Sequence, residues 1–310
     1  MTENRMPTDP EEVRRDRIVW TTLIILGVLV AAGVLGLGWR AFEGRLDAAK
    51  RLDRAMALLK QSDSTIASVD EIIRSGVSSA AGARAAEIAP QVDTASSELA
   101  EANILAATGF ERLTDDEQER ALLVQAAAKA RGEMLSSARE VLDATGKAAL
   151  AAKLADEAWT RMLAADDLAR QSVADYNKLT AADVRKGAAA GEKATAGFTA
   201  ARDLFSEAAS AFPEAGLGEF VSYVDGRLAL VALSTRAEKA WLAGKSGQAD
   251  KLISSYNKQS DAIVRRAKKL PGPPDDTIAQ AYRALADGPS SAYVRARERV
   301  VEADTALRTL

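Results

Sequence analysis

The segment from Ile18 to Trp39 reads IVWTTLIILGVLVAAGVLGLGW and carries no charged side chain. At about 1.5 Å per residue, a helix over these residues spans roughly 33 Å, enough to cross a hydrocarbon core of ~30 Å. Trp20 and Trp39 stand near its two ends, where amphipathic rings settle at the level of the lipid headgroups. We therefore predict a retained transmembrane helix over residues 18–39. A cleavable signal peptide is the alternative, although its apolar region should extend over only ~7–15 residues.

The charges beside this segment indicate its orientation. Arg14, Arg15 and Arg17 crowd the N-terminal flank, whereas the basic residues after Trp39 are spread more widely. A long domain can cross the membrane whatever its charge, so the short flank carries more weight. We expect a signal-anchor protein that crosses the cell membrane once, with a disordered polar tail at residues 1–17 in the cytoplasm and the C-terminal domain outside.

Small residues recur within the segment at a spacing of four. Gly27 and Ala31 form one pair, and Ala32 and Gly36 form another. This spacing lets two helices approach closely in lipid. The two pairs are therefore candidates for helix packing inside the membrane.

The composition excludes several classes of function. The chain of 310 residues has a net charge of -3 and a pI near 5.4, which gives no support for nucleic-acid binding. It contains no histidine and no cysteine, which removes the usual general base, the thiol nucleophile and the commonest transition-metal ligands. We predict a protein that is not an enzyme and needs no cofactor or metal. The frequent Ala, Arg and Asp resemble the usage of GC-rich bacteria.

The rest of the chain has apolar spacing typical of helices and no strand pattern of useful length. We therefore predict an all-α fold with eight helices after the anchor. A helical stalk is expected at residues 40–75, where apolar residues recur every seven positions: Leu52, Leu59, Ile66 and Ile73. Two interpretations stay open, one helix of an intramolecular bundle or a parallel coiled coil that forms a homodimer.

Turn residues divide the chain after the stalk into two regions. A segment rich in Ser and Gly ends the stalk, and a helical hairpin region is predicted at 83–145, where Thr114 and Glu117 have the spacing of a capping box. Gly146 is expected to end this region, and a helical repeat-like domain is predicted at 148–310.

Within the repeat-like domain, Thr180 and Ser246 are predicted helix caps. Gly288-Pro289 is predicted to break the last part of the chain into two short helices.

An offset of 80 residues aligns two parts of this domain. It brings Tyr176-Asn177-Lys178 onto Tyr256-Asn257-Lys258 and pairs Val173 with Ile253. A duplicated helical hairpin and a chance match in an alanine-rich chain both account for the alignment.

Residues 182–215 resemble a tetratricopeptide repeat, because Ala201, Phe205, Ala208 and Pro213 have the spacing of its second helix. A weaker likeness extends to residue 270. The preceding helix lacks the Trp, Leu-Gly and Tyr of that family. The resemblance implies a short array of helical hairpins with a concave surface for peptides or proteins, and an antiparallel helical bundle is the alternative.

A basic cluster is the remaining candidate for partner binding. Arg265, Arg266, Lys268 and Lys269 lie at a predicted helix C-terminus, where they can compensate the helix dipole or contact an anionic partner. Gly244-Lys245-Ser246 resembles the end of a phosphate-binding loop, but Lys239 stands where that motif needs a glycine.

These features predict a membrane-anchored, non-enzymatic helical protein that binds or scaffolds another protein of the cell envelope. The alternative is an extracytoplasmic ligand-sensing module that signals through a partner membrane protein. The tail of residues 1–17 is too short to be an output domain, so this alternative requires such a partner.

Overall fold

The computed structural model describes the backbone of residues 10–309 and the side chains of residues 43–309. Over this range the fold is all-α, as predicted, and the described residues contain no strand. The described α-helices are α1 (Pro10–Ser75), α2 (Ser79–Ala107), α3 (Asp115–Tyr176), α4 (Ala181–Ala211), α5 (Gly218–Leu242), α6 (Ser246–Ala267) and α7 (Pro274–Thr309), and the 3-10 helices are η1 (Phe110–Arg112) and η2 (Pro213–Ala215).

The chain divides into two compact units. Unit 1 comprises the segment that ends at Gln61, Glu98–Ala130, and the segment that begins at Arg299. Unit 2 comprises Ser62–Ser97 and Arg131–Glu298. Helices α1, α2, α3 and α7 therefore supply residues to both units, whereas α4, α5 and α6 belong to unit 2 alone.

The predicted transmembrane segment 18–39 lies within the helical backbone of α1. Its side chains, and with them the pairs Gly27/Ala31 and Ala32/Gly36, fall outside the described residues. From residue 43 to residue 309 the structure contains no helix with the length and apolar character needed to span a bilayer.

The N-terminal tail differs in part from its prediction. Because α1 begins at Pro10, residues 10–17 are helical rather than disordered. Proline is well tolerated in the first turn of a helix, and the sequence from there to Trp39 contains no other proline. Residues 1–9 lie outside the described range.

The apolar residues of the predicted heptad stripe pack against other residues of the same chain. Leu52 and Leu59 are buried within unit 1 at 3% and 5% exposure. In unit 2 the buried positions of α1 shift to Val69 and Ile72, and Ile73 is only half-buried. The intramolecular interpretation accounts for this burial, and the homodimer stays a prediction.

Most of the predicted helix ends are confirmed. Gly76, with φ of 68°, follows the last residue of α1. The capping box is formed, since the Thr114 backbone N–H donates to Glu117 Oε2 at 2.9 Å and the Glu117 N–H donates to Thr114 Oγ1 at 3.4 Å. Thr180 Oγ1 accepts from the Asp183 N–H and caps α4. Ser246 is not a cap, because it is the first residue of α6 and the capping position is Lys245.

Two predicted breaks are absent. α3 continues through Gly146, and α7 continues through Gly288-Pro289. Buried residues stand on both sides of these positions: Thr145 and Ala149 beside Gly146, and Ala286 and Tyr293 around Pro289. Tertiary packing can outweigh the roughly 1–3 kcal/mol that glycine or proline costs within a helix. The described residues consequently form seven α-helices rather than eight after the anchor.

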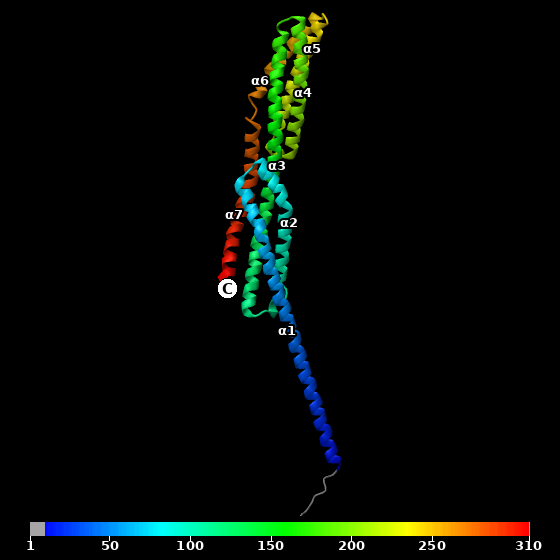
Figure 1. The fold of residues 1–310 in the computed structure, drawn as a ribbon, viewed down its shortest axis with the longest axis vertical. Helices are drawn as coiled ribbons and strands as arrows, with labels where there is room; N and C mark the ends of the chain where they lie inside the picture. The colour runs from blue at the N-terminus through cyan, green and yellow to red at the C-terminus, as the bar shows by residue number, and fades with distance from the viewer. Residues whose placement is uncertain (1–9, 310) are drawn as a thin grey trace, which may run out of the picture. The chain divides into compact units, whose positions relative to one another are not determined.

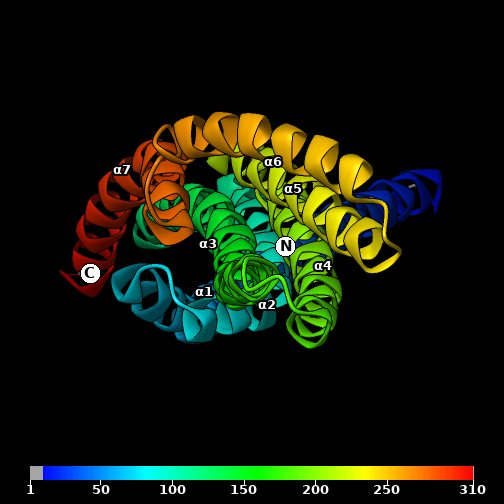
Figure 2. The same cartoon turned by 90° about the horizontal axis from the view of Figure 1, so that it is seen from above.

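An aromatic stripe supplies the largest side chains of a core in unit 2 that is otherwise rich in alanine. Phe198, Phe205 and Phe212 recur every seven residues along and just after α4, and all are fully buried. Phe220 of α5 stacks on Phe205 with ring centroids 5.3 Å apart. Figures 1 and 2 show α5 between α4 and α6, so α5 contacts both neighbours.

Replacing Gly146 with alanine is expected to stabilise the protein by about 0.5–1 kcal/mol, because glycine is a poor helix former and an added Cβ meets no atom within 4 Å. The matched control is Gly82→Ala in α2, where the Cβ would lie 2.4 Å from Ala149 Cβ. This variant is expected to lose roughly 1–3 kcal/mol. Urea unfolding of the full chain measures the change in the free energy of unfolding for both variants. Equal effects of the two substitutions on the free energy of unfolding would contradict the close contact between Gly82 of α2 and Ala149 of α3.

Candidate functional site

A cavity of about 180 Å³ lies in unit 2 between the C-terminal end of α3, the middle of α5 and α6. Its lining residues are Val173 and Tyr176 of α3, Asn177 directly after α3, Ser234 and Glu238 of α5, and Ile253, Tyr256 and Asn257 of α6. The wall combines apolar surface, two phenol groups, two amides and one carboxyl group. Such a mixture of apolar walls and a few convergent polar groups is typical of small-ligand sites.

The residues that the 80-residue offset aligns meet at this cavity. Tyr176-Asn177 and Tyr256-Asn257 both line it, and so do Val173 and Ile253. Two helices far apart in the sequence therefore present the same residue types to one space. The duplication itself stays a prediction, but the alignment indicated residues that share a site.

Glu238 is the residue that the sequence pattern did not single out. Its side chain is 0% exposed, and its Oε1 accepts a hydrogen bond of 2.7 Å from the Ser172 hydroxyl. Among the described residues, Oε2 has no hydrogen-bond partner. The sequence does carry one signal of its burial. Glu238 lies four residues after Ser234 and seven after Val231, a spacing that places all three on the same face of α5, which is buried.

Burial changes the acidity of this carboxyl group. Removal from water raises the pKa of Glu238 from 4.5 to about 7, while the Ser172 hydroxyl and the charge of Lys239 act in the opposite direction. The Lys239 ammonium is held 3.0 Å from Glu192 Oε1 at the surface. Glu238 therefore lacks a cation of its own close to its free oxygen.

Glycines of α4 close the side of Glu238 that faces away from α6. A Cβ at Gly187 would lie 2.9 Å from the Ser172 carbonyl oxygen and 3.3 Å from Glu238 Oε1. A Cβ at Gly191 would lie 2.5 Å from Thr235 Oγ1. Because only glycine fits at these positions, α4 packs directly against the backbone and side chains that hold the carboxyl group.

Charged residues lie at the C-terminal end of α3, next to residues that line the cavity. The Asp175 carboxylate is buried and accepts from Lys178 Nζ at 2.6 Å, and this contact lowers the pKa of Asp175. The pKa of Tyr176 is raised, first by burial and then by the negative charges of Asp250 and Glu238.

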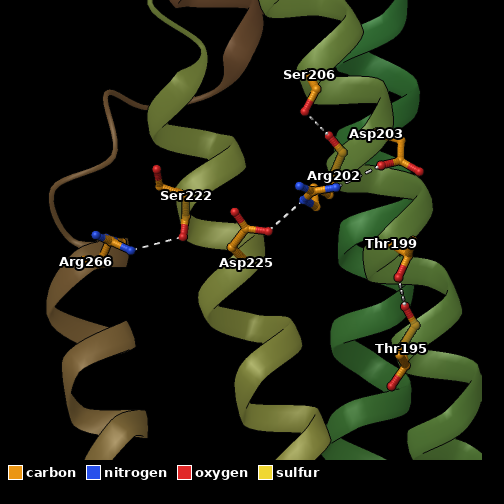
Figure 3. A network of polar contacts seen from close by, with 8 residues as sticks. All are labelled: Thr195, Thr199, Arg202, Asp203, Ser206, Ser222, Asp225 and Arg266. Atoms are coloured by element: carbon orange, nitrogen blue, oxygen red, sulfur yellow. Dashed lines mark hydrogen bonds and ion pairs between the residues drawn. The ribbon is translucent and has the colours of Figure 1, made fainter.

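The predicted basic cluster lies elsewhere, at the C-terminal end of α6. All four residues are exposed: Arg265, Arg266, Lys268 and Lys269. Arg266 Nη1 donates to the Ser222 carbonyl oxygen of α5 at 3.0 Å, as Figure 3 shows. In the same view Arg202 of α4 donates to Asp225 of α5 at 2.8 Å. Arg266 thus has a structural role that joins two helices, and the cluster lines no part of the cavity.

The titratable groups in the wall of the cavity are one carboxyl group and two phenol groups. Glu238 is its only carboxyl group, and no histidine, cysteine or lysine lines it. In the part of the chain that the structure describes, no three acidic side chains come together as a metal site.

Comparison with protein families, with curated proteins and with solved structures gives no match. Function is accordingly inferred from the geometry of the cavity.

Glu238→Gln is expected to remove a pH-dependent loss of stability. As the pH rises from 4.5 to about 7, the unfolded chain releases the proton of Glu238 while the folded chain retains it, so wild-type stability falls by about 3 kcal/mol. Glutamine still accepts from Ser172 but cannot ionise. Urea unfolding should show a gain of roughly 2–3 kcal/mol for the variant at pH 8 and little change at pH 5.

The control is Glu207→Gln, which removes an exposed carboxylate from α4. This variant should keep the wild-type difference between pH 5 and pH 8. If Glu238→Gln shifts the stability equally at both pH values, the buried carboxyl group is not the cause of the pH dependence.

Proposed function

We propose that this chain is a membrane-anchored, non-enzymatic helical protein that binds a small ligand in the cavity between α3, α5 and α6. The observation that carries the proposal is the buried carboxyl group of Glu238, with one oxygen free, in the wall of an otherwise apolar and amide-lined space. An unpaired buried polar group costs about 1–3 kcal/mol, so a ligand that pairs with it gains binding energy.

This proposal favours the sensing alternative over the scaffolding role. A cavity of about 180 Å³ is smaller than the ~300–1,000 Å³ of sites for drug-sized ligands, so it suits a small molecule rather than a peptide. The transmembrane helix at 18–39 would anchor the domain to the cell membrane, with the ligand site on the extracytoplasmic side. In this role, the signal would pass through a partner membrane protein.

A protein-binding role is the second candidate, and the residues of the tetratricopeptide-like segment favour it. Ala201, Phe205 and Ala208 are all fully buried on one face of α4, and Pro213 opens the 3-10 helix that follows it. Small residues at helix contacts and a proline at the end of the unit are what the resemblance implies. In this role, the surface of the α4–α6 hairpins would bind a protein of the cell envelope.

Filling the cavity is expected to abolish ligand binding. In Ile253→Trp the larger side chain would enter the cavity, whereas in Val264→Trp it would lie on a part of α6 where the native valine is 52% exposed. A thermal-shift screen of the full chain should find a small molecule that raises the Tm of the wild type and of Val264→Trp but leaves Ile253→Trp unchanged. Circular dichroism of the unliganded variants checks that both are folded. A ligand that stabilises all three proteins equally binds elsewhere.

The proposed orientation of the chain in the membrane predicts that its C-terminus is accessible to protease from outside the cell. A C-terminal tag on the full chain should be cut by protease added to intact spheroplasts, because the helical domain is expected outside the membrane. A tag on a cytoplasmic protein, tested in parallel, should survive until lysis. Survival of both tags would place the domain inside the cell and remove the extracytoplasmic sensing role.

A further inference from the structure

We infer that the ligand of this cavity is a small organic cation whose ammonium group pairs with Glu238 and lies against the rings of Tyr176 and Tyr256. The inference rests on the proposed function, since it names the chemical class that the same cavity would take. Three features support it: the charge of the lining residues, the free carboxyl oxygen, and the two aromatic rings.

The charge of the lining residues argues against an anionic ligand. No lysine or arginine lines the cavity, and its one carboxyl group is buried without a cationic partner at its free oxygen. An anion would be desolvated beside Glu238 and would find no positive group to pair with. A cation would give the carboxylate the partner that it lacks within the described chain.

The aromatic rings favour an organic cation over a metal ion. Tyr176 and Tyr256 come from different helices and both line the cavity with Glu238. The face of a tyrosine ring attracts an ammonium group, and the attraction increases when the site is shielded from water. Calcium ions instead take six to eight oxygen ligands, and this wall offers one carboxyl group with a few neutral oxygens.

The polar rim would orient the ligand. Asn177 and Asn257 stand next to the two tyrosines in the sequence and are exposed, so they lie where the cavity meets solvent. An amide can donate and accept hydrogen bonds, and it can therefore hold a polar group at the other end of the ligand. The apolar side chains of Val173 and Ile253 leave room for a short hydrocarbon chain between the two ends.

The affinity should depend on pH, because a cation binds the ionised form of Glu238. Ser172 on α3 donates to this carboxyl group, and the charge of Lys239 on α5, which pairs with Glu192 of α4 at the surface, acts on it. Tyr176 on α3 is affected by the charges of Glu238 and of Asp250 on α6, and α4 presents Gly187 to the carboxyl group. Of these groups, Glu238 is the one whose pKa, about 7, lies near neutrality. Binding should weaken about 10-fold from pH 8 to pH 6, and this dependence should vanish in Glu238→Gln.

Calorimetric titration of the full chain tests the inference with three probes of equal length: n-butylammonium, n-butanol and butyrate. The wild type should bind n-butylammonium at least about 10-fold more tightly than n-butanol, and butyrate should not bind. Glu238→Gln should lose this 10-fold preference. Tyr256→Leu should weaken n-butylammonium binding by about 5- to 30-fold, whereas Tyr256→Phe, which keeps the ring, should not.

The other outcomes separate the two proposals. If n-butanol binds as tightly as n-butylammonium, and Ile253→Trp blocks both, the cavity is a ligand site but the cation inference is wrong. Preferential binding of butyrate would also overturn it. If none of the three probes binds, the result counts against the cation and against the ligand-binding function together.

Discussion

The close approach of α3, α4 and α5 through alanine and glycine is the constraint on which unit 2 depends. Gly197 lies where a Cβ would be 2.9 Å from Ala165 Cβ, and Gly191 lies where a Cβ would be 2.5 Å from Thr235 Oγ1. Large side chains would hold the helices further apart. The small residues and the phenylalanines of α4 share one buried face, since Gly191, Phe198 and Phe205 stand seven residues apart, and Phe220 of α5 stacks on Phe205.

This close approach determines the chemistry of Glu238. Because α4 presents backbone rather than side chains to the carboxyl group, water is excluded from that side, and the pKa is raised to about 7. The hydroxyl of Ser172 satisfies one oxygen, and the other is left for the cavity. A packing arrangement that costs stability at neutral pH is easiest to understand where the buried group has a ligand.

The same arrangement decides which side chains meet at the cavity. The cavity gathers tyrosine, asparagine and one carboxyl group from three helices, but no second titratable group acts on Glu238 at hydrogen-bonding distance among the described residues. The basic cluster of α6, a candidate from its sequence, is exposed, and Arg266 joins α6 to α5. The site lies instead on the inner side of α6, where the repeated Tyr-Asn pair meets its counterpart from α3.

The sequence by itself determined the all-α class, the C-terminal end of α1, the cap of α4 at Thr180 and the capping box at Thr114, because these depend on local hydrogen bonds and on helical periodicity. It also aligned Tyr176 with Tyr256. Only the tertiary structure decided that α3 continues through Gly146 and α7 through Pro289, since contacts with other helices compensate their low helix propensity. Likewise, no local pattern brings Ser172, Gly187 and Glu238 together, because their contact depends on how three helices pack. The candidate site is therefore a property of the fold rather than of any one segment.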